Sequence, residues 1–302
     1  MNTKINRYIS SLEYFFTEKV NNLNVIILFK RAVYLFILFN AIISLPIASQ
    51  IWSTDSYLIH YYPFNNLLIK TLNVLSRQGV NNYYMYFLYG QIICCLACLA
   101  GFMKRIAGVL LYFISANLYF NAAQIQNGGT NILLITLFYL LFINEDAEKH
   151  KNEKLKIIDI SVSNFAFFAA QIQVCILYFV SAVSKLQGTH WLDGSALYYV
   201  FNLDEYSTNW FRRYVANTNW ITIPLTYFTL FFQLAFPVMV WIKKLKPITL
   251  IVGIIFHVFI IFIMGITDFG IIMLIMYILF LSENKALQIL SLRKNKLYDK
   301  SE

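Results

Sequence analysis

A lysine at the end of a long apolar segment is the residue of this sequence best placed to do chemistry. Lys185 follows the apolar stretch Phe165–Val183 and precedes the turn Trp191-Leu192-Asp193-Gly194. An ammonium group at the edge of hydrocarbon is costly unless it is paired, hydrated or deprotonated. Lys185 is therefore predicted to be a catalytic base, the alternative being a side chain that only extends to the lipid headgroups.

His257 is the second residue predicted to be catalytic. It lies inside another apolar segment, Ile248–Gly265. Imidazole exchanges protons near neutral pH, so a histidine beside a lysine would make an acid–base pair. The alternative is a structural histidine that only fills the core.

Polar residues inside apolar segments suggest where a substrate binds. Asn117, Asn121 and Gln124 recur at i, i+4 and i+7, which places them on one helical face. Lipid cannot satisfy amides, so this face is predicted to point into the helix bundle or a wet cavity. Gly128-Gly129-Thr130-Asn131 would begin a helix whose free N–H groups bind a carbonyl or oxyanion, or would form only a tight turn. The predicted substrate-binding residues are Asn121, Gln124, Gly128, Gly129, Asn131, Trp191, Asp193 and Gly194.

The composition indicates an integral membrane protein. Hydrophobic residues make up 59% of the chain and charged residues 13%, which is far from a soluble globule. The net charge of +9 does not indicate nucleic-acid binding, because the basic residues form short clusters between apolar runs. Cys94, Cys95 and Cys98 lie within an apolar run without a nearby histidine or acid, so buried thiols are expected and no metal site.

The apolar runs predict an all-α bundle of about eight transmembrane helices, each needing about 20 residues to cross the bilayer. The predicted spans are Val25–Leu45, Tyr83–Met103, Ala107–Ala123, Asn131–Ile143, Phe165–Lys185, Ile221–Ile242, Ile248–Gly265 and Phe269–Leu281. The expected organisation is a cytoplasmic segment 1–24, a membrane domain 25–282 and a basic cytoplasmic tail 283–302.

Basic residues alternate between the two sides of these spans. One side carries 17 lysines and arginines and the other carries only Lys70, Arg77, Arg212 and Arg213. The positive-inside rule then places both termini in the cytoplasm and the loop 186–220 outside. Within that loop, the aromatic segment Ala196–Leu203 is apolar enough to form a re-entrant or interfacial element.

Three groups of residues resemble the HTTM superfamily, to which the membrane domain of vitamin K-dependent gamma-carboxylase belongs. The most specific group is Tyr178-Phe179, Lys185-Leu186, Trp191 and the run from Asp193 to Tyr199. The segment 127–133 is similar to the family's Gly-Gly-Asp-Asn signature, with Thr130 where aspartate is usual. His257 with Gly265, Phe269 and Leu279-Phe280-Leu281 resembles the closing segment, so the likeness runs from about Leu28 to Leu281.

The resemblance implies a role for the lysine. The residue of the carboxylase that corresponds to Lys185 is assigned as the base that deprotonates reduced vitamin K on the lumenal side, which agrees with the outward position predicted here. Two departures argue against glutamate carboxylation. The chain has no histidine in the segment 127–131, where the carboxylase has one, and it lacks the carboxylase's soluble substrate-binding domain.

Three functions therefore stay open. The chain looks most like bacterial family members that mature a secreted peptide toxin at the outer membrane face, together with a separate partner protein. The second function is a lysine-base enzyme that uses a lipid quinone as cofactor. The third is a non-catalytic membrane carrier or immunity protein. The sequence does not decide which bond is made or broken.

Overall fold

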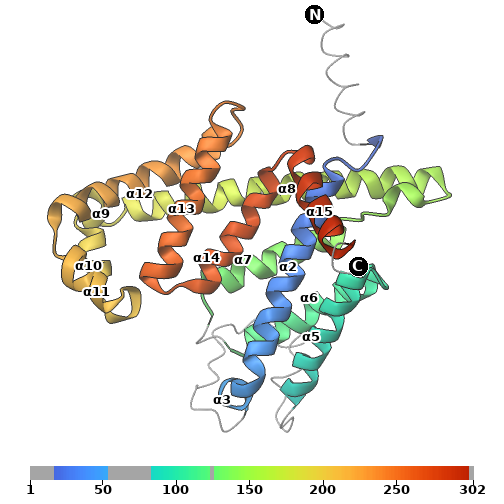
Figure 1. Cartoon of the computed structure of the whole chain (residues 1–302), viewed down its shortest axis with the longest axis horizontal. Coiled ribbons are helices and arrows are strands. Elements are labelled where there is room, and N and C mark those ends of the chain that lie inside the picture. Colours follow the sequence, from blue (N-terminus) through green and yellow to red (C-terminus); the bar gives the residue numbers. More distant parts are fainter. Residues whose placement is uncertain (1–16, 54–82, 123–125, 299–302) are drawn as a thin grey trace, which may run out of the picture. The chain divides into compact units, whose positions relative to one another are not determined.

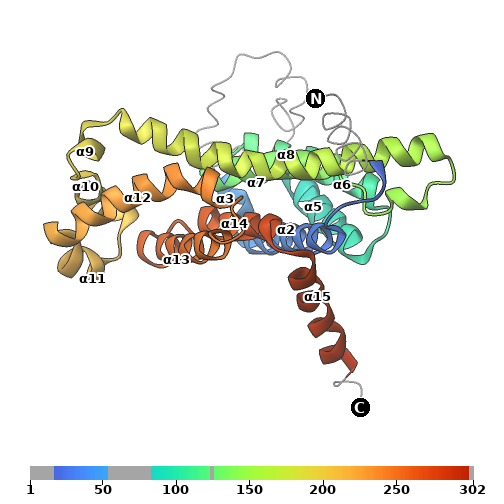
Figure 2. The same ribbon diagram turned by 90° about the horizontal axis from the view of Figure 1, so that it is seen from above.

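The computed structural model describes residues 17–53, 83–122 and 126–298, and every regular element in these ranges is a helix. Figure 1 shows the labelled helices, coloured along the sequence from blue at the N-terminus to red at the C-terminus. The chain forms two compact units, residues 1–167 with 281–302, and residues 168–280. Helix α8, Glu153–Leu186, is one continuous helix, whose residues 153–167 belong to the first unit and 168–186 to the second (Figure 2).

The described helices confirm a multi-pass, all-helical membrane protein. Six helices are long and apolar enough to cross a bilayer, or seven if Thr267–Phe280 and Glu283–Ser291 together count as one span. The predicted number of eight is not confirmed. Helix α6, Lys104–Phe120, has the same 17 residues in length as the predicted third span, but it begins and ends three residues earlier, because a turn begins at Asn121.

In the first unit, the long helices between residues 23 and 142 each pack against the next in chain order, and the last helix of the chain returns to pack against the first of them. Its described elements are α2 (Leu23–Ser44), η1 (Leu45–Ile47), α3 (Ala48–Trp52), α5 (Tyr83–Ala100), α6, α7 (Gly128–Phe142), η3 (Ala147–Lys149), the first part of α8, and α15 (Glu283–Tyr298). Helix α5 packs against α2 and α6, α6 packs against α7, and α15 packs against α2.

The Glu283 carboxylate stabilises the start of α2. Glu283 accepts hydrogen bonds from the backbone N–H and the side-chain amide of Asn24, at 2.9 and 2.7 Å. A carboxylate at the first turn of α2 also complements the helix dipole. The start of α2 is therefore tied to the start of α15.

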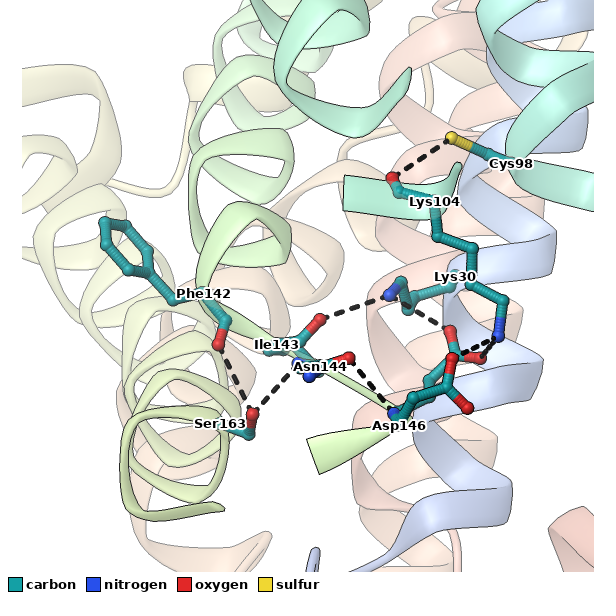
Figure 3. A network of polar contacts seen from close by, with 9 residues as sticks. Lys30, Cys98, Lys104, Phe142, Ile143, Asn144, Asp146 and Ser163 are labelled. Atoms are coloured by element: carbon teal, nitrogen blue, oxygen red, sulfur yellow. Dashed lines mark hydrogen bonds and ion pairs between the residues drawn. The ribbon is translucent and has the colours of Figure 1, made fainter. Parts of the chain in front are cut away.

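A buried ion pair connects α2 to the segment that follows α7. Lys30 Nζ lies 3.0 Å from Glu145 and donates to the carbonyl of Ile143 at 3.2 Å. Lys104 contacts Glu145 and Asp146, at 3.2 and 3.0 Å (Figure 3). Because each cation faces a carboxylate, charges within the apolar helices are compensated locally.

The second unit contains the last part of α8, from Phe168 onward. Its other elements are α9 (Thr189–Leu192), α10 (Ala196–Asn202), η4 (Asp204–Tyr206), α11 (Asn209–Phe211), η5 (Arg212–Ala216), α12 (Asn219–Met239), α13 (Lys246–Met264), α14 (Thr267–Met276) and η6 (Tyr277–Phe280). Helices α13 and α14 pack against each other, and α10 packs against α12.

The aromatic segment predicted to be re-entrant or interfacial forms α10. Leu197 and Phe201 are buried in a cluster with Phe211 and Ala216. The Leu197 N–H also donates to the Thr226 hydroxyl at 3.3 Å, which ties α10 to α12. Its depth in a membrane stays a prediction.

Candidate functional site

Helix α8 brings three polar side chains of the second unit to one face. Tyr178, Ser181 and Lys185 are spaced at i, i+3 and i+7, which aligns them along an α-helix. All three line a cavity of about 250 Å³, together with Trp191 and His257. The cavity thus contains both residues that the sequence predicted to be catalytic.

Lys185 is held by neutral groups. Its Nζ donates to the Ser181 hydroxyl at 2.6 Å and lies 5.3 Å from the centre of the Trp191 ring. Ser181 in turn donates to the Gln233 side-chain oxygen at 3.4 Å. Among the described residues, no carboxylate forms an ion pair with Lys185. An amine in such surroundings can be charged or neutral without breaking an ion pair.

Two tyrosines and a histidine form a hydrogen-bonded trio deeper in the unit. The Tyr178 hydroxyl lies 2.7 Å from His257 Nε2 and also forms a hydrogen bond with the Tyr277 hydroxyl. All three residues are buried, and His257 is 1% exposed. Among the described residues, Nδ1 of His257 has no hydrogen-bond partner.

Gly253 makes room for Tyr277. A Cβ atom at this position would lie 2.2 Å from the Tyr277 hydroxyl oxygen and 2.6 Å from its ring. Real Cβ atoms essentially never approach other atoms so closely. Any larger residue at position 253 would therefore push Tyr277 away from Tyr178.

The remaining wall of the cavity is mostly apolar. Phe201, Phe256, Phe259 and Met273 contribute to it. A second cavity of about 230 Å³ between α12 and α13 shares Phe256, Phe259, Leu197 and Thr229 with the first. Both cavities are lined mostly by apolar side chains with few polar groups, which is typical of sites for small lipid-soluble molecules.

The turn after α8 is fastened to α12. Gly194 has φ +82°, and a Cβ there would lie 3.0 Å from Ile223 and from Tyr227. The Tyr227 hydroxyl donates to the Leu192 carbonyl at 2.9 Å. The Ser195 hydroxyl and backbone N–H both donate to Asp193 and hold the pKa of that carboxyl below its usual range. Asp193 thus stabilises the turn that carries Trp191.

Comparison with known proteins places the chain in a family. The HTTM domain profile matches residues 60–284, which is more than half of the chain. The chain belongs to the HTTM family. This confirms the resemblance derived from the Lys185-Leu186 and Trp191 motifs.

Two bacterial proteins are similar to this HTTM protein. It is 28% identical over 242 residues to the uncharacterized protein YitO of Bacillus subtilis, covering 74% of this chain and 77% of YitO. It is 28% identical over 249 residues to the sporulation-delaying protein SdpB of the same organism, covering 76% of this chain and 74% of SdpB. No solved structure matches it.

The structure places the predicted site residues of the HTTM chain in both units. Lys185, Trp191 and His257 line one cavity of the second unit, and Asp193 and Gly194 form the adjoining turn. Asn121, Gly128, Gly129 and Asn131 belong to the first unit.

In the first unit, N–H groups at the start of α7 are already bound by the side chain of the capping residue, Asn127. The Asn127 side chain accepts from the N–H groups of Gly129 and Thr130, at 2.7 and 3.2 Å. The Asn121 amide is buried and donates to the Asn117 carbonyl at 2.7 Å, while Asn131 is exposed and Gln124 lies outside the described residues. A substrate-binding role for these residues stays a prediction.

Sequence reasoning did not assign Tyr178, Ser181, Gln233 or Tyr277 to the site. Helical spacing from Lys185 is a signal that would have found Tyr178 and Ser181. Tyr277 lies 99 residues after Tyr178 and carries no local signal of the contact.

Proposed function

We propose that this chain is the membrane component of a system that matures a secreted peptide toxin, acting at the outer membrane face with a separate SdpA-like partner protein. The similarity to SdpB over about three quarters of both chains carries this proposal. The cavity of the second unit supports it by offering a site where Lys185 can act.

In this proposal Lys185 acts as the catalytic base. A lysine with neutral hydrogen-bond partners can release and accept a proton without breaking an ion pair. The Ser181 hydroxyl orients its Nζ, and Trp191 covers it. The positive-inside rule, applied to the distribution of basic residues, predicts that this end of α8 lies on the outer side, where a secreted precursor would pass.

The test is secretion of the mature peptide by cells that express the chain with its peptide precursor and partner protein. Lys185→Arg keeps the positive charge but holds its proton, and Lys185→Met removes the amine. Both substitutions are expected to abolish mature peptide, measured by mass spectrometry of the medium, at unchanged membrane abundance. Lys243→Met is the matched control, because Lys243 is an exposed lysine between α12 and α13.

Each outcome separates the possible roles of Lys185. Wild-type maturation by Lys185→Arg would show that only the charge matters and would exclude the base. Wild-type maturation by Lys185→Met would show that the lysine is dispensable and only extends to the lipid headgroups.

A second candidate function is a quinone-dependent enzyme with Lys185 as its base. The mostly apolar cavity, lined by Lys185 and by a histidine nitrogen without a hydrogen-bond partner among the described residues, favours it. The lining fits a lipid quinone, which in reduced form would supply an acidic hydroxyl. Lys185 would take that proton, Ser181 would hold the amine in place, and the aromatic wall would exclude water. Quinone in lipid extracts of the purified protein would support this function, and its absence from them would count against it.

A further inference from the structure

We infer that His257 serves as a fixed hydrogen-bond donor, through Nδ1, to an oxygen of an apolar, lipid-soluble ligand in the cavity of the second unit. The inference goes beyond peptide maturation and deepens the second candidate function, since it names the class of ligand that the Lys185 cavity binds and a residue that holds it. It also gives His257 a role other than proton transfer.

The hydrogen bonds of the trio have two arrangements. Tyr178 has one hydroxyl proton and two partners, Tyr277 and His257 Nε2, so it donates to one and accepts from the other. In the first arrangement, Tyr277 donates to Tyr178 and Tyr178 donates to Nε2. The ring proton of neutral His257 is then on Nδ1.

In the second arrangement both hydrogen bonds run in the opposite direction. His257 Nε2–H donates to Tyr178, and Tyr178 donates to Tyr277. The Tyr277 proton then lacks an acceptor among the described residues. Tyr277 is 3% exposed and does not line the cavity, so a ligand cannot supply one there. A buried donor without an acceptor is expensive.

Only the first arrangement leaves its unpaired donor where a ligand can meet it. That donor is Nδ1–H of His257, a residue that lines the cavity. A doubly protonated ring would need a counter-ion at this depth, and no described carboxylate forms an ion pair with His257. Lys185, in the same cavity, would add repulsion.

The lining indicates what the ligand is. Its unpaired or cationic polar groups, Nδ1–H of His257 and Nζ of Lys185, are donors. Among the other polar side chains of the lining, Ser181, Thr229 and Gln233 already form hydrogen bonds within the protein, and the remaining contacts are mostly apolar. A peptide amide brings its own N–H beside each carbonyl and would need an acceptor as well. A ring or chain that carries carbonyl-type oxygens without N–H groups fits these walls better.

The first test reads the tautomer directly. The full chain, labelled with ¹⁵N-histidine and placed in lipid vesicles, is examined by NMR at pH 7, and the signals lost in His257→Asn belong to His257. We expect a proton on Nδ1, with the preference lost in Tyr178→Phe. A proton on Nε2 in the wild-type chain would overturn the inference, whatever the Lys185 variants do to maturation.

The second test measures affinity for two matched probes by equilibrium dialysis of the purified chain. Duroquinone carries two carbonyl oxygens and durene is the same methylated ring without them. One hydrogen bond corresponds to about tenfold in affinity. His257→Leu is therefore expected to weaken duroquinone binding about tenfold and to leave durene binding unchanged.

Isosteric variants sharpen this test. The amide of Asn lies near the position of Nδ1 and that of Gln near Nε2, so His257→Asn should bind duroquinone better than His257→Gln. Equal losses for both probes, or no binding of duroquinone to the wild-type chain, would overturn the inference. Failure of Lys185 variants to affect maturation would instead overturn the proposed function alone.

Discussion

The Ser181 hydroxyl accepts a hydrogen bond from Lys185 Nζ at 2.6 Å, one helical turn before it on α8. In the part of the chain that the structure describes, this amine has one other hydrogen-bond acceptor, the Ser181 carbonyl, at 3.5 Å. One hydroxyl group therefore determines where the lysine points.

Replacing this hydroxyl should impair function without removing the lysine. Ser181→Ala takes away the main acceptor of Lys185, so maturation of the secreted peptide should fall about tenfold. Ser184→Ala is the control, because Ser184 is exposed on the same helix. Mass spectrometry of the medium measures both, and equal maturation by the two variants would show that Ser181 does not position the amine.

Gly253 should tolerate no side chain. Gly253→Ala forces Tyr277 away from Tyr178, and overpacking of this kind costs about 1–3 kcal/mol. Gly108→Ala in α6 meets no atom within 4 Å and should stabilise by about 0.4–1 kcal/mol. Thermal unfolding of the purified variants should thus shift in opposite directions. An unchanged unfolding temperature for Gly253→Ala would contradict the observed packing.

The ion pair of the first unit should matter for stability. Lys30 and Glu145 have side chains that are 8% and 15% exposed. Glu145→Gln leaves a buried lysine without its counter-ion and should destabilise by about 3 kcal/mol. Glu153→Gln, which breaks the more exposed pair with Lys156, should cost less than about 1 kcal/mol. Denaturation of both variants in detergent compares them, and similar stabilities would mean that Lys30 finds another partner.

The orientation can be read by cysteine labelling. In a chain without its four native cysteines, Thr189→Cys should react with a membrane-impermeant maleimide added to intact cells, and Lys244→Cys should react only after lysis. Both positions are exposed in the structure. The expectation follows from the distribution of basic residues. Labelling of Lys244→Cys in intact cells would reverse the orientation.

The sequence alone was sufficient to predict an all-helical membrane protein of the HTTM family. Apolar runs such as Ile248–Gly265 can satisfy their backbone groups in lipid only as helices, so composition and period decide the class. The position of Lys185 near the end of its helix could also be predicted from nearby sequence alone, because it follows from the length of the preceding apolar run.

Span ends were harder to predict, because helix ends depend on contacts as well as on hydrophobicity. Helix α8 begins at Glu153 rather than Phe165. Helix α7 begins at Gly128, where the two glycines predicted a helix start, although the apolar run begins only near Asn131. Asn127 caps this additional turn.

Tertiary structure alone brought Tyr178, His257 and Tyr277 together. These residues come from α8, α13 and η6, and each lies in an apolar segment where a single polar residue has many possible partners. Their meeting depends on the close approach of Gly253 to Tyr277, which is a matter of shape between distant helices. Local periodicity determines which face of a helix a residue occupies, but packing decides which other face it meets.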